Sequence, residues 1–108
     1  MPDFNAFWSE LQKEIVEFAD YSWKTYKASA IKDGKAFLLK SKDDLRRWTD
    51  LLAEGSLTKD DFEWLVAGKK DVAELVALKQ KGLAQVALDR FTNGVIDTIV
   101  STAFKMFL

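Results

Sequence analysis

The sequence predicts an all-α protein, a small helical bundle of four to six helices in one domain over residues 1–108. Apolar side chains recur every three or four residues in most of the chain, and no stretch alternates for long with the two-residue period of a strand. One proline and five glycines leave few positions at which helices must break. These observations argue against a sandwich or barrel, which needs many turns.

A long amphipathic helix is predicted at the N-terminus, over residues 3–31. Its apolar face is formed by Phe4, Phe7, Trp8, Leu11, Ile15, Phe18, Ala19, Ser22 and Tyr26. Asp3 has the side chain of an N-cap, since its carboxylate can accept from the first free backbone N–H groups. Asp33-Gly34 is a turn pair and predicts the end of this segment.

A helical hairpin is predicted over residues 41–68, inside the same domain. Ser41 and Thr58 each open the pattern of a capping box, with aspartate in the place of glutamate or glutamine. Both residues are therefore predicted N-caps, and Gly55 and Gly68 are predicted to end the two helices. Residues 35–40, which precede the hairpin, fit either a short helix or an apolar link.

The hairpin also carries a family resemblance. The segment reads Leu45-Arg-Arg-Trp48, Leu51-Leu52, Gly55-Ser-Leu57-Thr58 and Asp61-Phe62. An apolar helix, a glycine turn, an aliphatic–threonine pair, an acidic residue and a phenylalanine resemble the short helical-hairpin module called SHOCT over residues 45–62. The resemblance implies a role in interaction or oligomerisation, and it carries over no catalytic residue.

Beyond the hairpin, the pattern from Lys69 is helical again. The predicted shared face consists of Val72, Leu75, Val76, Leu83 and Val86. Two glycines leave the boundaries open. Gly82 and Gly94 either break the helices or lie inside them, at a cost of about 1 kcal/mol relative to alanine.

The last fourteen residues, Val95–Leu108, form the most apolar predicted helix. Its apolar side chains spread over an arc of roughly 200°, whereas a surface helix shows a stripe of little more than about 100°. Such a helix must be covered on two sides, so we expect its own domain on one side and a partner on the other. The predicted interface residues are Ile96, Ile99, Val100, Ala103, Phe104 and Phe107.

Composition argues against catalysis and against cofactors or metals. The chain has no histidine and no cysteine, and therefore lacks the commonest general base and the commonest transition-metal ligands. The aspartate pairs at residues 43–44 and 60–61 lie where first turns of helices are predicted, and negative side chains favour the helix dipole there. We expect no enzyme activity, no cofactor and no metal site.

The four tryptophans of the chain raise the alternative of a ligand cage. Each of them, Trp8, Trp23, Trp48 and Trp64, is assigned to an apolar helix face. Aromatic residues at helical spacing are more often core than cage, so we expect all four to pack in the core.

The sequence argues against nucleic acid as a partner. Lysine and arginine total 16 against 17 aspartate and glutamate, for a net charge of −1. The hairpin has the outline of a helix-turn-helix, but Asp60, Asp61 and Glu63 occupy the part of its second helix that would face DNA. Three carboxylates there would repel phosphates.

No targeting or spanning segment is visible. The first residues, MPDFNAFWSE, have no basic region of a signal peptide, and no window approaches the length of apolar residues that spans a bilayer. We expect a cytoplasmic protein. The sequence thus predicts a non-enzymatic protein that associates with itself or with another protein. The alternatives are a membrane-surface protein that uses its apolar C-terminal helix and, more weakly, a helix-turn-helix DNA binder.

Overall fold

The computed structural model describes residues 3–108, which form five α-helices, two 3₁₀ turns and no strand. The elements are α1 (Phe4–Ser22), η1 (Lys24–Tyr26), α2 (Lys27–Glu54), α3 (Lys59–Gly68), η2 (Lys69–Val72), α4 (Val76–Gln80) and α5 (Gln85–Phe107). The prediction of a small all-α bundle is therefore confirmed.

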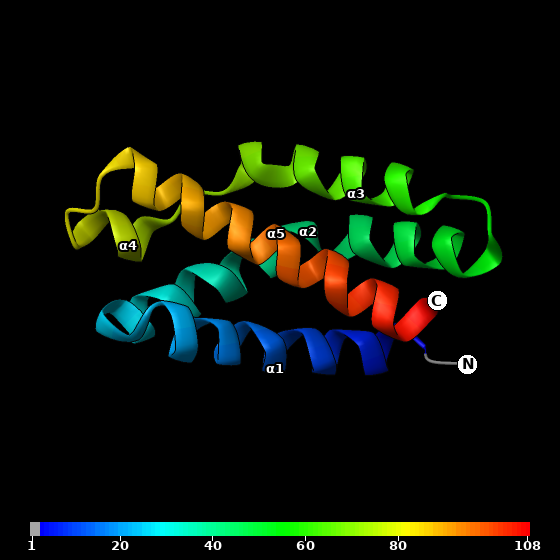
Figure 1. Ribbon diagram of the computed structural model, residues 1–108, viewed down its shortest axis with the longest axis horizontal. Helices are drawn as coiled ribbons and strands as arrows, with labels where there is room; N and C mark the ends of the chain where they lie inside the picture. Colours follow the sequence, from blue (N-terminus) through cyan, green and yellow to red (C-terminus); the bar gives the residue numbers. More distant parts are fainter. Residues whose placement is uncertain (1–2) are drawn as a thin grey trace.

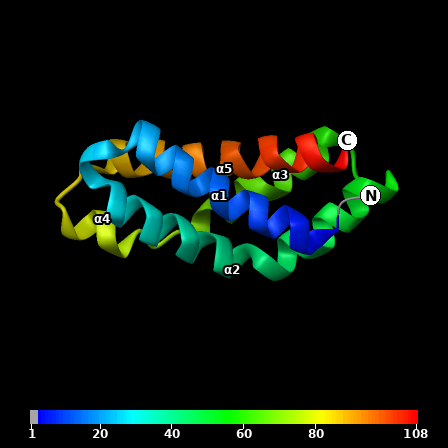
Figure 2. The same ribbon diagram turned by 90° about the horizontal axis from the view of Figure 1, so that it is seen from below.

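The C-terminal helix α5 crosses the middle of the bundle. In Figure 1, α1 and α3 lie on opposite sides of α5 and α2 passes behind it, and α5 contacts all three. The short α4 packs against α2 at one end. At the other end α1 begins beside the end of α5 (Figures 1 and 2), where the rings of Phe7 and Phe107 lie 5.4 Å apart.

One hydrophobic core draws side chains from every helix. Its fully buried members include Phe7 of α1, Leu38 of α2, Phe62 of α3, Leu78 of α4 and Ile99 of α5. Because α4 is too short to hold its shape alone, its place depends on this shared core.

Four of the predicted helix boundaries are confirmed. The Asp3 carboxylate accepts from the backbone N–H of Ala6 at 2.8 Å, and the Thr58 hydroxyl accepts from that of Asp61 at 3.0 Å. Gly55 follows α2 with φ of 82°, a left-handed conformation that glycine adopts without strain. Gly68 is the last residue of α3.

The predicted single helix over residues 3–31 is wrong, because α1 ends at Ser22. The chain reverses through Trp23 and η1, and α2 then packs back along α1. No glycine or proline marks this reversal. Trp23 instead packs edge-on against Phe91 of α5, at 5.3 Å between ring centres. The residue at which α1 ends is thus held by a contact with a distant segment of the chain.

The predicted stop at Asp33-Gly34 is also wrong, since both residues are buried inside α2. The Asp33 carboxylate accepts from the backbone N–H groups of Ala77 and Leu78, at 3.0 and 2.7 Å, and so caps α4 from another helix. A Cβ on Gly34 would lie 2.9 Å from Cγ2 of Ile15. The glycine here permits close packing of α2 on α1 instead of a turn.

Ser41 is not an N-cap. Residues 35–40 are helical, and α2 runs through Ser41 without interruption to Glu54. The Ser41 side chain is buried, and its hydroxyl has no hydrogen-bond partner among residues 3–108. The predicted hairpin therefore consists of the C-terminal half of α2, the Gly55 turn and α3.

The single helical face predicted from Lys69 onward is wrong as well. The chain forms η2, an extended link and α4, and both Val76 and Val86 are largely exposed. Gly82 has φ of 78° and separates α4 from α5, so it breaks the helix. Gly94 lies inside α5, where a Cβ would come within 2.4 Å of the Phe18 ring.

Candidate functional site

The predicted interface residues of the C-terminal helix lie mostly in the core. Ile96, Ile99, Val100 and Ala103 are buried, with exposures of 8% or less. The second covering surface, which the sequence analysis assigned to a partner, is supplied by the same chain. The same chain can cover both sides because α5 lies in the middle of the bundle, with α1 on one side and α3 on the other.

The two remaining predicted interface residues are half-buried at the edges of this core. The ring centre of Phe104 lies 5.9 Å from that of Phe62 of α3, and the ammonium of Lys59 lies 5.5 Å from the same Phe104 ring centre. Phe107 packs on Phe7 of α1. The structure therefore does not bring the six predicted residues together on one free surface.

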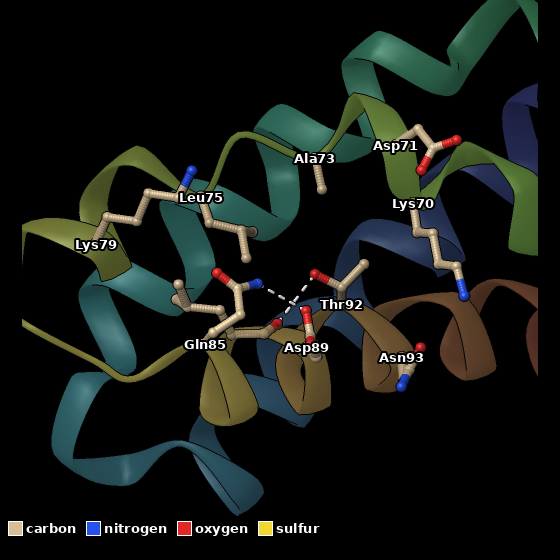
Figure 3. Close-up of a pocket in the computed structure, with 10 residues that line it drawn as sticks. Lys70, Asp71, Ala73, Leu75, Lys79, Gln85, Asp89, Thr92 and Asn93 are labelled. Atoms are coloured by element: carbon tan, nitrogen blue, oxygen red, sulfur yellow. Dashed lines mark hydrogen bonds between the residues drawn. The ribbon is translucent and has the colours of Figure 1, made fainter.

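A polar hollow of 380 Å³ lies between η2, the segment before α4 and the start of α5 (Figure 3). Figure 3 shows that Gln85 and Thr92 bond to their neighbours in this hollow. The Gln85 amide donates to the Asp89 carboxylate at 2.8 Å, and the Thr92 hydroxyl donates to the Leu88 carbonyl at 3.1 Å. Thr92, the one hydroxyl of the lining, therefore bonds to a backbone carbonyl and not to a carboxylate.

The strongest candidate is a groove between α2 and α3, which we call the tryptophan groove. It has a volume of 470 Å³ and is lined by Trp48, Trp64, Leu65, Ala67, Gly68 and Lys70. Trp48 is half-buried, whereas Trp64 is 76% exposed and stands at the edge of the groove. A large apolar side chain exposed beside an apolar hollow is typical of a binding surface.

An ion-pair cluster fixes the relative position of the two helices at this groove. Asp44 of α2 accepts from the ammonium of Lys69 at 2.6 Å and from the guanidinium of Arg47 at 2.7 Å. The bond from Lys69 lowers the pKa of Asp44, against the effect of burial, and Arg47 lowers it further. Asp44 and Lys69 therefore join α2 to η2, the turn that follows α3 beside the groove.

Trp64 is the residue that the sequence analysis missed, because all four tryptophans were assigned to the core. Trp8, Trp23 and Trp48 are half-buried and pack against it, but Trp64 is not part of it. The signal was present in α3. The buried residues Phe62 and Val66 lie two positions either side of Trp64, which places the indole on the opposite side of the helix.

Comparison of the chain with protein-family models, with curated proteins and with solved structures finds no match. The resemblance of residues 45–62 to the SHOCT module stays a prediction. None of the helices in residues 3–108 is long and apolar enough to cross a membrane. Within the same residues, no three histidine, cysteine or acidic side chains lie close enough to hold a metal ion.

Proposed function

We propose that the chain is a non-enzymatic helical protein that associates with a second copy of itself through the tryptophan groove. The observation that carries this proposal is the exposed Trp64 beside a hollow of the same patch. A patch with both a projecting side chain and a hollow can be complementary to itself, as a two-fold interface requires. Tryptophan is also enriched among the residues that dominate binding energy.

The charges along α3 support an antiparallel arrangement of two copies. Asp60, Asp61 and Glu63 lie exposed before Trp64, whereas the exposed Lys70 follows the helix and Lys69 is paired with Asp44 of the same chain. In an antiparallel pair, the acidic end of one α3 meets the basic end of the other. The helix dipoles are also opposed in this arrangement.

The alternatives have less support. The apolar side chains of α5, which suggested a membrane surface, are mostly covered by α1, α2 and α3. For DNA binding, α3 would have to bring Asp60, Asp61 and Glu63 to the phosphates, and these side chains are exposed. Another protein partner at the tryptophan groove would use the same apolar contacts.

The test is the mass of the protein in solution, measured by light scattering and sedimentation across a dilution series. We expect a dimer that dissociates on dilution, and Trp64→Glu should be a folded monomer at every concentration. Leu39→Glu is the matched control, because Leu39 is 65% exposed and lies nine residues before Trp48, on the opposite side of α2.

A wild-type protein that stays monomeric at high micromolar concentration would contradict self-association. Equal loss of dimer in both glutamate variants would show that the interface lies elsewhere. Binding of the wild type to lipid vesicles that is lost in Trp64→Glu would favour the membrane-surface alternative instead.

A further inference from the structure

A second and larger groove follows the seam between α1 and α5, and we call it the acidic groove. It consists of two adjacent hollows, of 730 and 460 Å³, which share Phe18 and Ser22 in their linings. It is formed by the second half of α1, Trp23 and the first half of α5. The tryptophan groove uses none of these residues.

The acidic groove has apolar side chains along its length. Phe18 lies over Gly94, where the absence of a side chain lets the two helices approach. Trp23 and Phe18 are half-buried, whereas Tyr21 and Val86 are 85% and 78% exposed. A ligand in this groove would therefore cover apolar surface that the fold leaves in contact with water.

The charge of the acidic groove is strongly one-sided. Its carboxylate side chains are Glu14, Glu17, Asp20, Asp89 and Asp97. The single cation in its lining is Arg90, which lies 5.8 Å from the centre of the Trp23 ring.

Neighbouring residues satisfy only part of this charge. Asp20 pairs with Lys27 at 3.1 Å, and Lys105 lies 3.6 Å from Glu14 at one end of the groove. Glu17 and Asp97 make no ion pair with any residue of 3–108.

At one end of the groove, Glu14 is affected by a neighbouring carboxyl group and by burial. A hydrogen bond with Glu10 raises the pKa of Glu14, and burial together with the charge of Glu17 raises it further. The positive charge of Lys105 opposes these effects without cancelling them. The charges of Glu17 and Glu10 are the smaller contributions to this shift, and a bound cation would oppose their repulsion of Glu14.

We propose that the acidic groove binds a cationic amphipathic segment of another protein, with lysine or arginine on one face and apolar side chains on the other. The apolar side chains would cover Phe18 and Trp23, while the basic ones would lie over Glu17 and Asp97. Helices bind in this way to apolar grooves with charged edges. Nucleic acid and anionic lipid carry the wrong charge for this surface.

The test uses the full chain and three labelled peptides of equal length, whose binding is followed by fluorescence anisotropy. The first has leucine and lysine at helical spacing, the second replaces lysine with glutamate, and the third replaces leucine with serine. We expect the leucine–lysine peptide to bind, with an affinity that falls as salt is raised, because exposed charges are screened. The other two should bind at least about tenfold more weakly, since each lacks one of the two kinds of contact.

A pair of double variants locates the binding. Glu17→Gln/Asp97→Asn should weaken the leucine–lysine peptide about five- to tenfold, as the loss of two exposed charge pairs predicts. Asp50→Asn/Glu54→Gln makes the same chemical changes on exposed residues near the end of α2, outside both grooves, and should leave the affinity unchanged.

Three results would each overturn the proposal. They are no binding of the leucine–lysine peptide, equal binding of the glutamate or serine peptide, and equal weakening by both double variants. The last result would mean a general attraction between opposite charges without a docking site. None of these outcomes depends on whether the chain dimerises through Trp64.

Discussion

Two segments of the chain carry nearly the same five residues, and they fold differently. Ser41-Lys42-Asp43-Asp44-Leu45 lies in the middle of the longest helix, whereas Thr58-Lys59-Asp60-Asp61-Phe62 begins α3. The second segment caps a helix through the Thr58 hydroxyl. The first has a buried serine whose hydroxyl has no partner in the part of the chain that the structure describes. The pattern alone therefore does not start a helix.

The residues that precede each segment make the difference. Before Thr58, Gly55 takes a left-handed conformation, and the backbone N–H groups of Ser56 and Leu57 both donate to the carbonyl of Leu51. The chain has then turned, so Thr58 is extended and its hydroxyl can reach the next turn. No such stop precedes Ser41, because the helix has to continue to place Phe37, Leu38 and Leu45 on one buried face. A capping pattern starts a helix only where the preceding helix has ended.

The largest expected difference between the two segments comes from placing aspartate at position 41 and at position 58. Thr58→Asp should change the free energy of unfolding by only a few tenths of a kcal/mol, because aspartate caps helices as well as threonine does. Ser41→Asp should cost about 3–5 kcal/mol, because it leaves an unpaired charge in the core. Urea unfolding followed by circular dichroism measures both.

Ser41→Asn is the control for size, since it has nearly the shape of aspartate without the charge. It should cost less than Ser41→Asp at neutral pH. A stable, folded Ser41→Asp variant would mean that Ser41 is exposed at a helix start, as its sequence pattern predicts.

A smaller difference should separate the alanine variants. Thr58→Ala removes the cap and should cost about 0.5–2 kcal/mol of the free energy of unfolding, whereas Thr58→Gly should cost only a few tenths. Ser41→Ala should be neutral or stabilising by up to about 1 kcal/mol, because it removes an unsatisfied buried hydroxyl and favours helix. In thermal and urea unfolding, Thr58→Ala should therefore lower the stability, whereas Ser41→Ala should not. Equal losses would contradict the assignment of Ser41 to a helix interior.

The features that the sequence predicts correctly are those that depend on residues close together in the chain. Asp3, Gly55 and Thr58 were identified correctly, because each boundary depends on backbone groups three or four positions away. The role of Asp33 was not predicted, because its partners Ala77 and Leu78 lie more than forty residues further along the chain. Sequence spacing gives no sign of that contact.

The functional surfaces follow the same rule. The apolar character of the last helix was visible, but which elements cover it depends on how distant segments meet. The exposure of Trp64 could have been predicted, since the spacing of Phe62 and Val66 already places it on the other face of α3. The acidic groove could not, because Glu17 and Asp97 come from opposite ends of the sequence.

The smallest effect concerns the last aspartate of the first segment. In a capping box the fourth residue bonds back to its own helix start, but Asp44 instead bonds to Lys69 beyond α3 and to Arg47 one turn along α2. Because the pKa of Asp44 is lower in the folded protein than its usual value, its contribution to stability is complete above that usual value. The contribution is lost as pH falls through the lowered pKa.

Asp44→Asn should therefore cost up to about 1 kcal/mol at pH 7, the range of a partly exposed ion pair. The difference between wild type and variant should shrink as the pH falls below the usual aspartate pKa of about 3.9, and disappear once Asp44 is protonated in the folded protein. In a Lys69→Gln background the same substitution should cost less and show a weaker pH dependence, as a double-mutant cycle of urea unfolding can measure. An undiminished cost in that background would show that Asp44 stabilises the protein through Arg47 alone, without joining α2 to the end of α3.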